Sequence, residues 1–198
     1  MEHLKENNLY DEFQSAYRQY FSTESALLRA KNDILNEMDK QNVMMLLLLD
    51  LSAAFDTIDH ETLLNRLSER CGVKGVALKW MHSYLSDRYQ MVKINDSVSN
   101  MTRVKYGVPQ GSVLGPILFT IYMSPLGKII EKCGLKRQTY ADDNGLYHAI
   151  SPTDKQAQNE TIEKVTNCIV NVKEFLLQNR LKINDDKTEF ILLGTKYW

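Results

Sequence analysis

The sequence has no long hydrophobic run, few cysteines and no excess of positive charge. Its longest apolar run, Val43 to Leu49, is far shorter than the roughly 20 residues that a membrane-spanning helix needs. The N-terminus lacks the basic-then-apolar pattern of a secretory signal. The cysteines Cys71, Cys133 and Cys168 are scattered without metal-binding spacing. These absences indicate an intracellular protein in a reducing compartment, without membrane contact, and argue against a thiol site.

The net charge of −1 means that no global positive field indicates a nucleic-acid partner. Only local groups of basic residues remain, such as Lys128, Lys132, Lys136 and Arg137. The 198 residues are 43% hydrophobic and 25% charged, which is ordinary for a globular chain with one core. This composition excludes the disordered and fibrous classes.

Helix and strand signals alternate along the chain. Helices are expected at about 22–39, 59–71, 76–85, 112–130 with an interruption near Pro125, and from 151 to beyond 176. Strands are expected at 43–49 and 189–193, with hairpins at 88–107, turning at Asn95-Asp96, and around 142–143. The alternation predicts an α+β fold in which helices cover one face of a sheet.

Three aspartates lie at positions where an unpaired charge would destabilise the fold. Asp50 ends the buried strand, where burial would raise its pKa unless a cation is near. Asp142 and Asp143 occupy the tip of a hairpin that is otherwise half-buried. If the two elements are neighbours in the sheet, the three carboxylates converge at a cost of several kcal/mol for each unpaired ion, which implies a bound cation. Oxygen ligands without His or Cys favour Mg²⁺ or Mn²⁺, and two such ions about 4 Å apart promote in-line phosphoryl displacement.

Each of these signals also has an ordinary structural interpretation. A single Asp at a strand end is usually a helix cap or a turn residue, and Asp-Asn-Gly is common in hairpin turns. A calcium site competes as well, but the 12-residue loop with alternating ligands and a closing Glu is absent. The residues alone therefore predict no more than a metal-dependent phosphoryl-transfer site.

Four ordered motifs extend this prediction. They read "LLLLDLSAAFDTIDHETLL", "YGVPQGSVLGPILFTIYMSPL", "YADDNGLY" and "LKINDDKTEFILLG". In this order and spacing they resemble the palm motifs of reverse transcriptases of LINE-type (non-long-terminal-repeat) retrotransposons, and "FQSAYRQYFSTESALL" resembles the finger segment before the palm. The similarity spans about Phe13 to Gly194. It implies a right-hand polymerase palm, an antiparallel sheet packed on helices, with partial fingers at 1–42, the palm at 43–198 and no thumb.

The resemblance implies roles for individual residues. Asp50 and Asp142 would ligate two Mg²⁺ ions, or Mn²⁺, with Asp143 as a third carboxylate, to activate a primer 3′-hydroxyl and stabilise the leaving pyrophosphate. Phe55 matches the steric gate that excludes ribonucleotides by contact with the sugar 2′ position, although a core-facing aromatic is the alternative. Lys187 matches a proton donor to pyrophosphate, with an exposed surface lysine as the alternative.

The remaining implied contacts concern the incoming nucleotide. They are Leu51, Gly107, Pro109, Gln110, Gly111 and, from the fingers, Arg18, which would face the triphosphate. Gly107 and Gly111 would let the backbone approach the nucleotide and template closely.

Two departures from the family bear on function. Asn144 and Gly145 replace the Thr-Gln of the more usual "YADDTQLY". Relative to the family, the chain is also expected to lack the upstream endonuclease, the first part of the fingers and the thumb. Two functions stay open: an RNA-directed DNA polymerase core of low activity, acting on an RNA template, a DNA primer and deoxynucleoside triphosphates, or a silent retroelement remnant that serves as a nucleic-acid or protein binding module.

Overall fold

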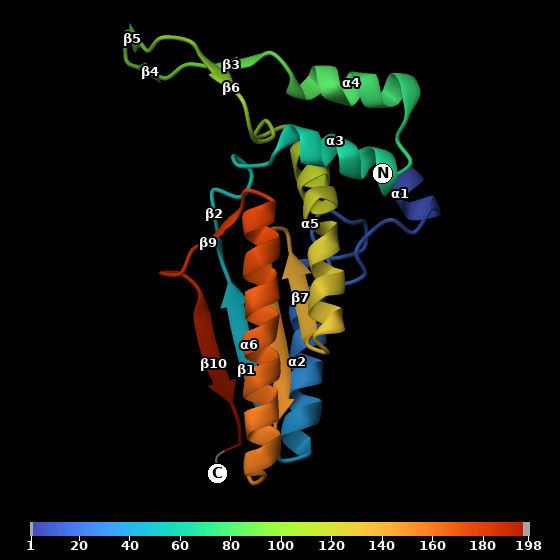
Figure 1. Ribbon diagram of the computed structural model, residues 1–198, viewed down its shortest axis with the longest axis vertical. Coiled ribbons are helices and arrows are strands. Elements are labelled where there is room, and N and C mark those ends of the chain that lie inside the picture. The colour runs from blue at the N-terminus through green and yellow to red at the C-terminus, as the bar shows by residue number, and fades with distance from the viewer. Residues whose placement is uncertain (1, 196–198) are drawn as a thin grey trace. The chain divides into compact units, whose positions relative to one another are not determined.

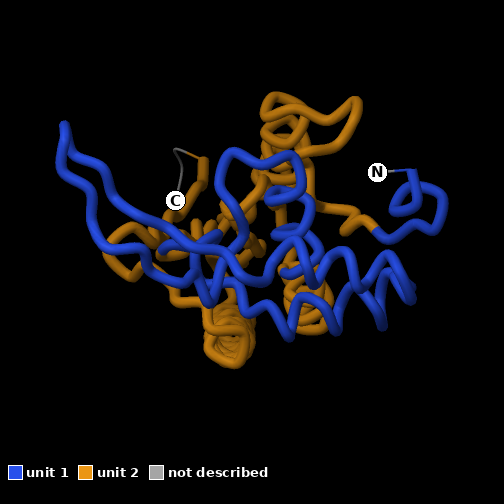
Figure 2. Tube along the Cα trace, turned by 90° about the horizontal axis from the view of Figure 1, so that it is seen from above, with its two compact units in different colours: residues 1–9, 53–122 blue, residues 10–52, 123–198 orange. Residues whose placement is uncertain are grey.

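The computed structural model describes residues 2–195. The chain forms two compact units, which are described separately below (Figure 2). Unit 1 comprises residues 1–9 and 53–122, and unit 2 comprises residues 10–52 and 123–198. This division rests on compactness, so the expected boundary between fingers and palm at residue 42 stays a prediction. Within residues 2–195, no helix combines the length and apolar character that crossing a membrane requires.

Short helices and a long hairpin dominate unit 1, whereas long helices and a sheet dominate unit 2 (Figure 1). Unit 1 contains α1 (Glu2–Glu6), α3 (His60–Glu69), α4 (Gly75–Leu85), β3 (Arg88–Gln90), β4 (Lys93–Ile94), β5 (Ser97–Val98) and β6 (Thr102–Val104). Unit 2 contains α2 (Thr23–Asp39), β1 (Val43–Leu49), β2 (Leu51–Ser52), β7 (Lys136–Tyr140), β8 (Asp143–Ile150), α6 (Lys155–Gln178), β9 (Lys182–Ile183) and β10 (Glu189–Leu193). Helix α5 (Gly115–Lys132) begins in unit 1 and ends in unit 2.

The sheet of unit 2 has the strand order β10-β1-β8-β7, and its pairs are antiparallel. Leu46 lies opposite Tyr147, whose hydroxyl donates to Asp33 Oδ2 of α2 at 2.8 Å, so this face of the sheet points to α2. The next residues, Leu47 and Leu146, are buried on the other face, in front of which α6 runs (Figure 1). The prediction of helices on one face only is therefore wrong. A nearly continuous apolar strand such as β1 is typical of a sheet buried on both sides.

Helix starts follow their capping residues. Ser22 begins α2 with the expected cap, since its side chain accepts from the Ser25 N–H. Asp59 caps α3 in the same way through the Thr62 N–H. Helix α6 begins at Lys155 rather than near residue 151, because Asp154 is the residue whose carboxylate accepts from the first-turn amides.

Helix α5 differs from its prediction at two points. It begins at Gly115 rather than residue 112, because the Ser112 hydroxyl accepts from the Gly115 N–H and so lies before the first turn. It also continues through Pro125, where an interruption was predicted. Buried side chains on both sides of the proline, Tyr122 and Leu126, hold this stretch in the core, and their burial offsets the lost backbone hydrogen bond.

Unit 1 has a small core below an exposed hairpin. Ile58, Leu63 and Phe119 are fully buried in that core. Strand β3 pairs with β6 and β4 with β5, so residues 88–104 form a two-stranded ribbon, hereafter the arm, that turns at Asn95 as predicted (Figure 1). Of the residues in its four strands, all but Val104 are exposed.

Candidate active site

Unit 2 gathers the three aspartates at one end of the β1–β8 pair. Leu49, the last residue of β1, lies opposite Asn144, so Asp50 and Asp143 occupy the next position on the two strands. Asp142 belongs to the two-residue turn between β7 and β8. The pKa of Asp143 is raised, first by burial and then by the negative charges of Asp142 and Asp50. The structure thus brings the three carboxylates together, although Asp50 and Asp142 lie 92 residues apart in the sequence.

The donor set of this cluster suits a hard divalent cation. It offers carboxylate oxygens from Asp50, Asp142 and Asp143 without a His or Cys ligand. In residues 2–195, however, no three His, Cys, Asp or Glu side chains are already arranged to hold a metal ion. Mg²⁺ is usually bound by one or two carboxylates and completed by waters and substrate phosphates, so the chemistry of these donors is compatible with a divalent cation.

A buried glutamine supports the turn that carries Asp142. Ala141 has a positive φ of 57°, which is costly for a residue with a side chain. Gln14 Nε2 donates to the Ala141 carbonyl at 3.0 Å, and the Ala141 N–H donates to Gln14 Oε1 at 2.9 Å. Asn144, which departs from the usual family residue, donates from Nδ2 to the Asp142 carbonyl at 2.7 Å. Sequence reasoning missed the role of Gln14, because no local spacing signals a partner 127 residues away.

Backbone hydrogen bonds link the Lys187 turn to Asp50. The Asn184 N–H donates to the Asp50 carbonyl at 2.9 Å, and the Lys187 N–H donates to the Asn184 carbonyl at 3.2 Å. The Lys187 side chain is exposed in this turn before β10. Leu51 is buried in β2, opposite Ile183 of β9. Leu51 and Lys187 therefore lie on the segments that flank Asp50.

Arg18 stabilises the segment before α2 through hydrogen bonds to its backbone. Its Nη1 donates to the carbonyls of Asp11 and Gln14, both at 3.0 Å, and its guanidinium lies 4.1 Å from the ring centroid of Phe21. These contacts hold the chain on either side of Gln14. A contact between Arg18 and a triphosphate stays a prediction.

In unit 1, Phe55 packs against the core and is only partly exposed. Its ring stacks on that of the buried Phe119, with centroids 4.5 Å apart and planes inclined by 23°. This contact fixes the orientation of the ring, and it is the contact expected if Phe55 is a core-facing aromatic residue. A steric-gate function uses the exposed part of the same ring and stays a prediction.

The loop at Gly107–Gly111 is tied to the segment after Phe55. The Gly107 N–H donates to the Ile58 carbonyl at 2.8 Å, and the Val108 N–H donates to the Phe55 carbonyl at 2.9 Å. Gly107 has a φ of +86°, and a Cβ there would lie 2.9 Å from backbone atoms of Phe55 and Asp56. Glycine is therefore required at this position both for its backbone conformation and for the close approach.

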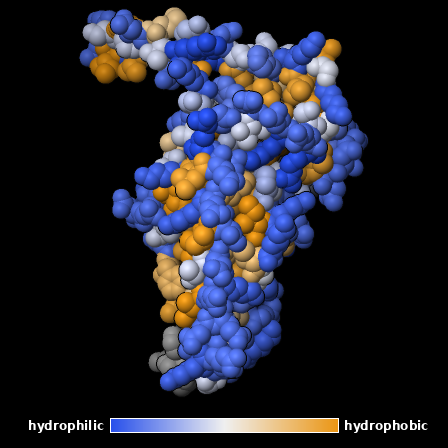
Figure 3. Space-filling model, in the orientation of Figure 1, coloured by the Kyte–Doolittle hydropathy of each residue, from blue (hydrophilic) through white to orange (hydrophobic). Residues whose placement is uncertain are grey.

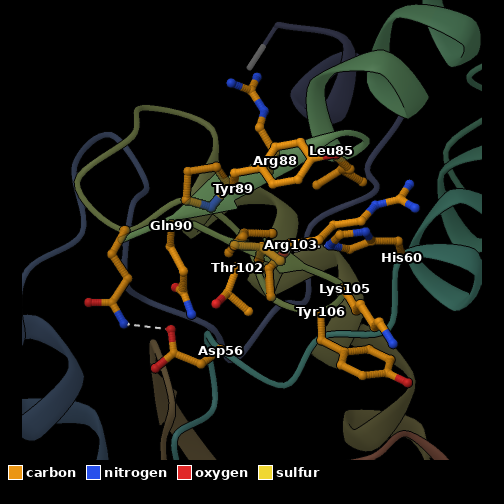
Figure 4. Close-up of a pocket in the computed structure, with 15 residues that line it drawn as sticks. Asp56, His60, Leu85, Arg88, Tyr89, Gln90, Thr102, Arg103, Lys105 and Tyr106 are labelled. Atoms are coloured by element: carbon orange, nitrogen blue, oxygen red, sulfur yellow. Dashed lines mark hydrogen bonds between the residues drawn. The ribbon is translucent and has the colours of Figure 1, made fainter. Parts of the chain in front are cut away.

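Asp56 and His60, which the sequence analysis did not single out, hydrogen-bond to the same loop. Gln110 Nε2 donates to Asp56 Oδ1 at 2.8 Å (Figure 4), and His60 Nε2 donates to the Gly107 carbonyl at 2.7 Å. Because a carboxylate only accepts, Asp56 directs the amide NH₂ of Gln110 toward itself and leaves Oε1 for another partner. Because a carbonyl only accepts, the proton of His60 lies on Nε2. Both residues lie within "AFDTIDH", so their nearness to Phe55 is the signal that could have found them.

An antiparallel sheet packed on helices, with carboxylates where the end of β1 meets the β7–β8 hairpin, is the arrangement expected of a right-hand polymerase palm. The chain belongs to the family described as reverse transcriptase (RNA-dependent DNA polymerase), whose model matches residues 1–197. This confirms the family resemblance and the predicted α+β fold.

Curated relatives include retrotransposon proteins, in agreement with the LINE-type resemblance. The probable RNA-directed DNA polymerase from transposon BS of Drosophila melanogaster is 27% identical over 93% of this chain and 20% of its own length. The RNA-directed DNA polymerase from mobile element jockey of the same species is 31% identical over 68% of this chain and 15% of its own length. The chain thus spans a fifth or less of these relatives.

Solved structures of telomerase share the fold. Telomerase from Candida albicans, in a complex with a fragment of telomeric RNA, superposes with a TM-score of 0.69 over 99% of this chain and 33% of its own, at 15% identity. Apo telomerase from Candida tropicalis, truncated from its C-terminal domain, gives 0.65 over 93% of this chain and 37% of its own, at 18% identity. At these identities the likeness concerns the fold alone.

Proposed function

We propose that this chain is the core of an RNA-directed DNA polymerase, which adds deoxynucleotides to a primer 3′-hydroxyl along an RNA template inside the cell. The observation that carries the proposal is the convergence of Asp50, Asp142 and Asp143 at the end of the β1–β8 pair. Burial and the two neighbouring carboxylates together raise the pKa of Asp143, an arrangement that is unfavourable for stability alone. Such an arrangement is typical of a site that needs positive charge to act.

The carboxylates of unit 2 have the central role. Asp50 and Asp142 would hold two Mg²⁺ ions, or Mn²⁺, and the bound metal would supply positive charge that lowers the pKa of the primer hydroxyl and neutralises the leaving pyrophosphate. Asp143 adds negative charge that strengthens cation binding. The Gln14 and Asn144 hydrogen bonds keep the Asp142 turn in one conformation, which limits the reorganisation needed at the moment of reaction. Lys187, on the turn linked to Asp50, supplies a proton or a positive charge to pyrophosphate.

Unit 1 supplies contacts that select the nucleotide. The exposed part of Phe55 excludes a 2′-hydroxyl, and the loop of Gly107, Pro109, Gln110 and Gly111 supports the incoming nucleotide. Asp56 and His60 act as positioning residues, since each bonds the loop directly. Glycine at positions 107 and 111 lets the backbone adopt the positive φ that the loop requires.

Primer extension tests the proposal. Purified chain is given a DNA primer on an RNA or a DNA template, with deoxynucleoside triphosphates and Mg²⁺ or Mn²⁺. We expect extension by a few nucleotides per encounter, because net charge −1 offers few phosphate contacts to hold the duplex. Asp142→Asn should lower the rate by about a hundredfold or more, whereas Asp39→Asn, an exposed carboxylate at the end of α2, should not. Equal rates for Asp142→Asn and wild type, or no extension with either metal, would refute the polymerase assignment.

A further inference from the structure

Two of the three cysteines lie together in unit 2, although they are far apart in the sequence. Cys133 directly follows α5, and Cys168 lies in the middle of α6. Asn171 Nδ2, three residues after Cys168, donates to Cys133 Sγ at 3.6 Å. One turn before Cys168, the side chain of Lys164 reaches Gly134, where a Cβ would lie 3.0 Å from Lys164 Cε and Nζ. Residues three and four apart share one face of a helix, so Cys168 lies on the face of α6 that meets residues 133 and 134.

The two thiols differ in their exposure to solvent. Cys133 is partly exposed, whereas Cys168 is fully buried. Figure 3 shows mainly hydrophilic side chains along the front of α6, in agreement with a buried stripe on its inner side. Burial raises the pKa of the Cys168 thiol, and a hydrogen bond with Cys133 and the charge of that residue raise it further. The thiol of Cys168 therefore faces that of Cys133.

The position of this pair in the sequence gives it a structural consequence. Residues 134–167 comprise β7, the turn with Asp142 and Asp143, β8 and the first half of α6. A bond between Cys133 and Cys168 would close this segment into a covalent loop. Because a disulfide restricts the unfolded chain more as its loop grows, a loop of this length should stabilise the fold measurably.

We propose that Cys133 and Cys168 form a peroxide-responsive dithiol, whose disulfide closes the loop that contains the β7–β8 hairpin. In the reducing compartment that the sequence predicts, disulfides are transient and serve redox sensing. Hydrogen peroxide is the oxidant, and a thiol of the glutathione class restores the two cysteines by exchange. The dithiol is independent of the polymerase chemistry proposed above, which uses no cysteine.

Cys133 reacts first, because it is the accessible thiol and the amide of Asn171 can donate to its thiolate. Its sulfur attacks one oxygen of the peroxide, the O–O bond breaks, and the departing hydroxide takes the thiol proton and leaves as water. Cys133 is then a sulfenic acid.

Cys168 completes the reaction as the resolving thiol. Its sulfur attacks the sulfur of Cys133, an S–S bond forms while the S–O bond breaks, and the Cys168 proton leaves in a second water molecule. In total, two thiols lose two electrons and one peroxide is reduced to two molecules of water.

Peptide mapping of the peroxide-treated chain tests the proposal. The full chain is reduced, freed of reductant and treated with a small excess of hydrogen peroxide, and remaining thiols are alkylated before digestion. We expect linked peptides that contain Cys133 and Cys168, with Cys71 alkylated. The oxidised chain should melt about 4–16 °C above the reduced chain, and dithiothreitol should reverse the shift.

Three variants assign the roles of the cysteines. Cys133→Ser should abolish both the linkage and the shift in the melting midpoint. Cys168→Ala should stop the reaction at the sulfenic acid, which dimedone labels at Cys133. Cys71→Ser is the matched control, since Cys71 is also buried but lies in unit 1, and it should oxidise as wild type does. If a variant fails to fold by circular dichroism, peptide mapping of the wild-type chain decides the pairing by itself.

Several results would overturn the proposal. Linkage to Cys71, or between two copies of the chain, would show that Cys133 and Cys168 are not the reactive pair. Conversion of Cys133 to a sulfinic acid without a disulfide would show that Cys168 does not reach it. A Cys133–Cys168 linkage without a rise in the melting midpoint would show that the bond forms only in a distorted chain.

Primer extension by the reduced chain separates this inference from the proposed function. The expected linkage without any extension would refute the polymerase assignment and leave the dithiol intact. Extension by a chain that forms no such linkage would refute the dithiol alone.

Discussion

Replacing Gly107 by alanine tests how tightly the loop is joined to the segment after Phe55. The new Cβ would lie 2.9 Å from the carbonyl oxygens of Phe55 and Asp56 and from the Asp56 Cα, a distance that real Cβ atoms essentially never show. The neighbours are backbone atoms, so no side chain can rotate away. The loop must therefore move, and the hydrogen bonds from Gly107 to Ile58 and from Val108 to Phe55 are placed under strain.

The structure provides a control that separates two contributions to the cost. Gly111 also has a positive φ, +75°, but its Cβ would meet nothing within 4 Å. Gly111→Ala should therefore cost only the backbone penalty, about 1–2 kcal/mol. Gly107→Ala adds overpacking, about 1–3 kcal/mol more. The expected loss of stability is about 2–5 kcal/mol for Gly107→Ala, and the difference between the two variants measures the contact itself.

Urea unfolding of both variants gives the stabilities, and amide hydrogen exchange reports the loop directly. In Gly107→Ala, we expect faster exchange at the Val108 N–H, because its bond to Phe55 is the one that the shift disturbs. In Gly111→Ala that amide should exchange as in wild type. Equal stability losses in the two variants, with Val108 unchanged in both, would show that the loop does not lie against Phe55 and Asp56 and would refute the reasoning.

Three further predictions concern the turn, the sheet face and the gate. Gln14→Leu should destabilise the chain by about 1–3 kcal/mol in urea unfolding, because it leaves two backbone groups of the buried Ala141 unpaired; a neutral result would contradict the supporting role. Burial alone would raise the pKa of Asp33, but hydrogen bonds from Lys136 and Tyr147 outweigh burial and lower it. Asp33 therefore stabilises the fold above its ordinary pKa of about 4, and the contribution is lost as pH falls through the lower folded value. Asp33→Asn should flatten the decline of the urea midpoint below about pH 5, and an unchanged decline would discount this carboxylate. Phe55→Ala should raise the use of ribonucleotides relative to deoxyribonucleotides in primer extension, and a constant ratio would leave Phe55 with its packing role on Phe119.

Local signals in the sequence predict the ends of most elements. Ser22 and Asp59 act through side-chain bonds to amides three residues away, so the information lies within one turn. The hairpin turn at Asn95 is local for the same reason, since Asn tolerates a positive φ. For the carboxylate site, the ordered motifs predict that Asp50 meets the Asp142-Asp143 hairpin, and the strand register brings them together.

What the sequence does not reveal depends on tertiary packing. Pro125 is a helix breaker by propensity, yet burial of Tyr122 and Leu126 keeps α5 continuous. Periodicity alone does not show that α2 lies on the face of Tyr147, because that depends on Asp33 meeting a strand more than a hundred residues later. Gln14 is likewise recognisable as a support only once its long-range partner is known.

The long-range pairing of β1 has a consequence for how the chain folds as it is synthesised. Strand β1, an unbroken apolar run, leaves the ribosome long before β8 and β10, the strands that flank it in the sheet. At roughly 5–20 residues per second, about a hundred residues of further synthesis take on the order of 5–20 s, during which β1 has neither neighbour. Closing such long loops before any pairing is gained also slows folding. Newly made chains should therefore depend on chaperones, and refolding from urea at high concentration should lose material to aggregation through β1.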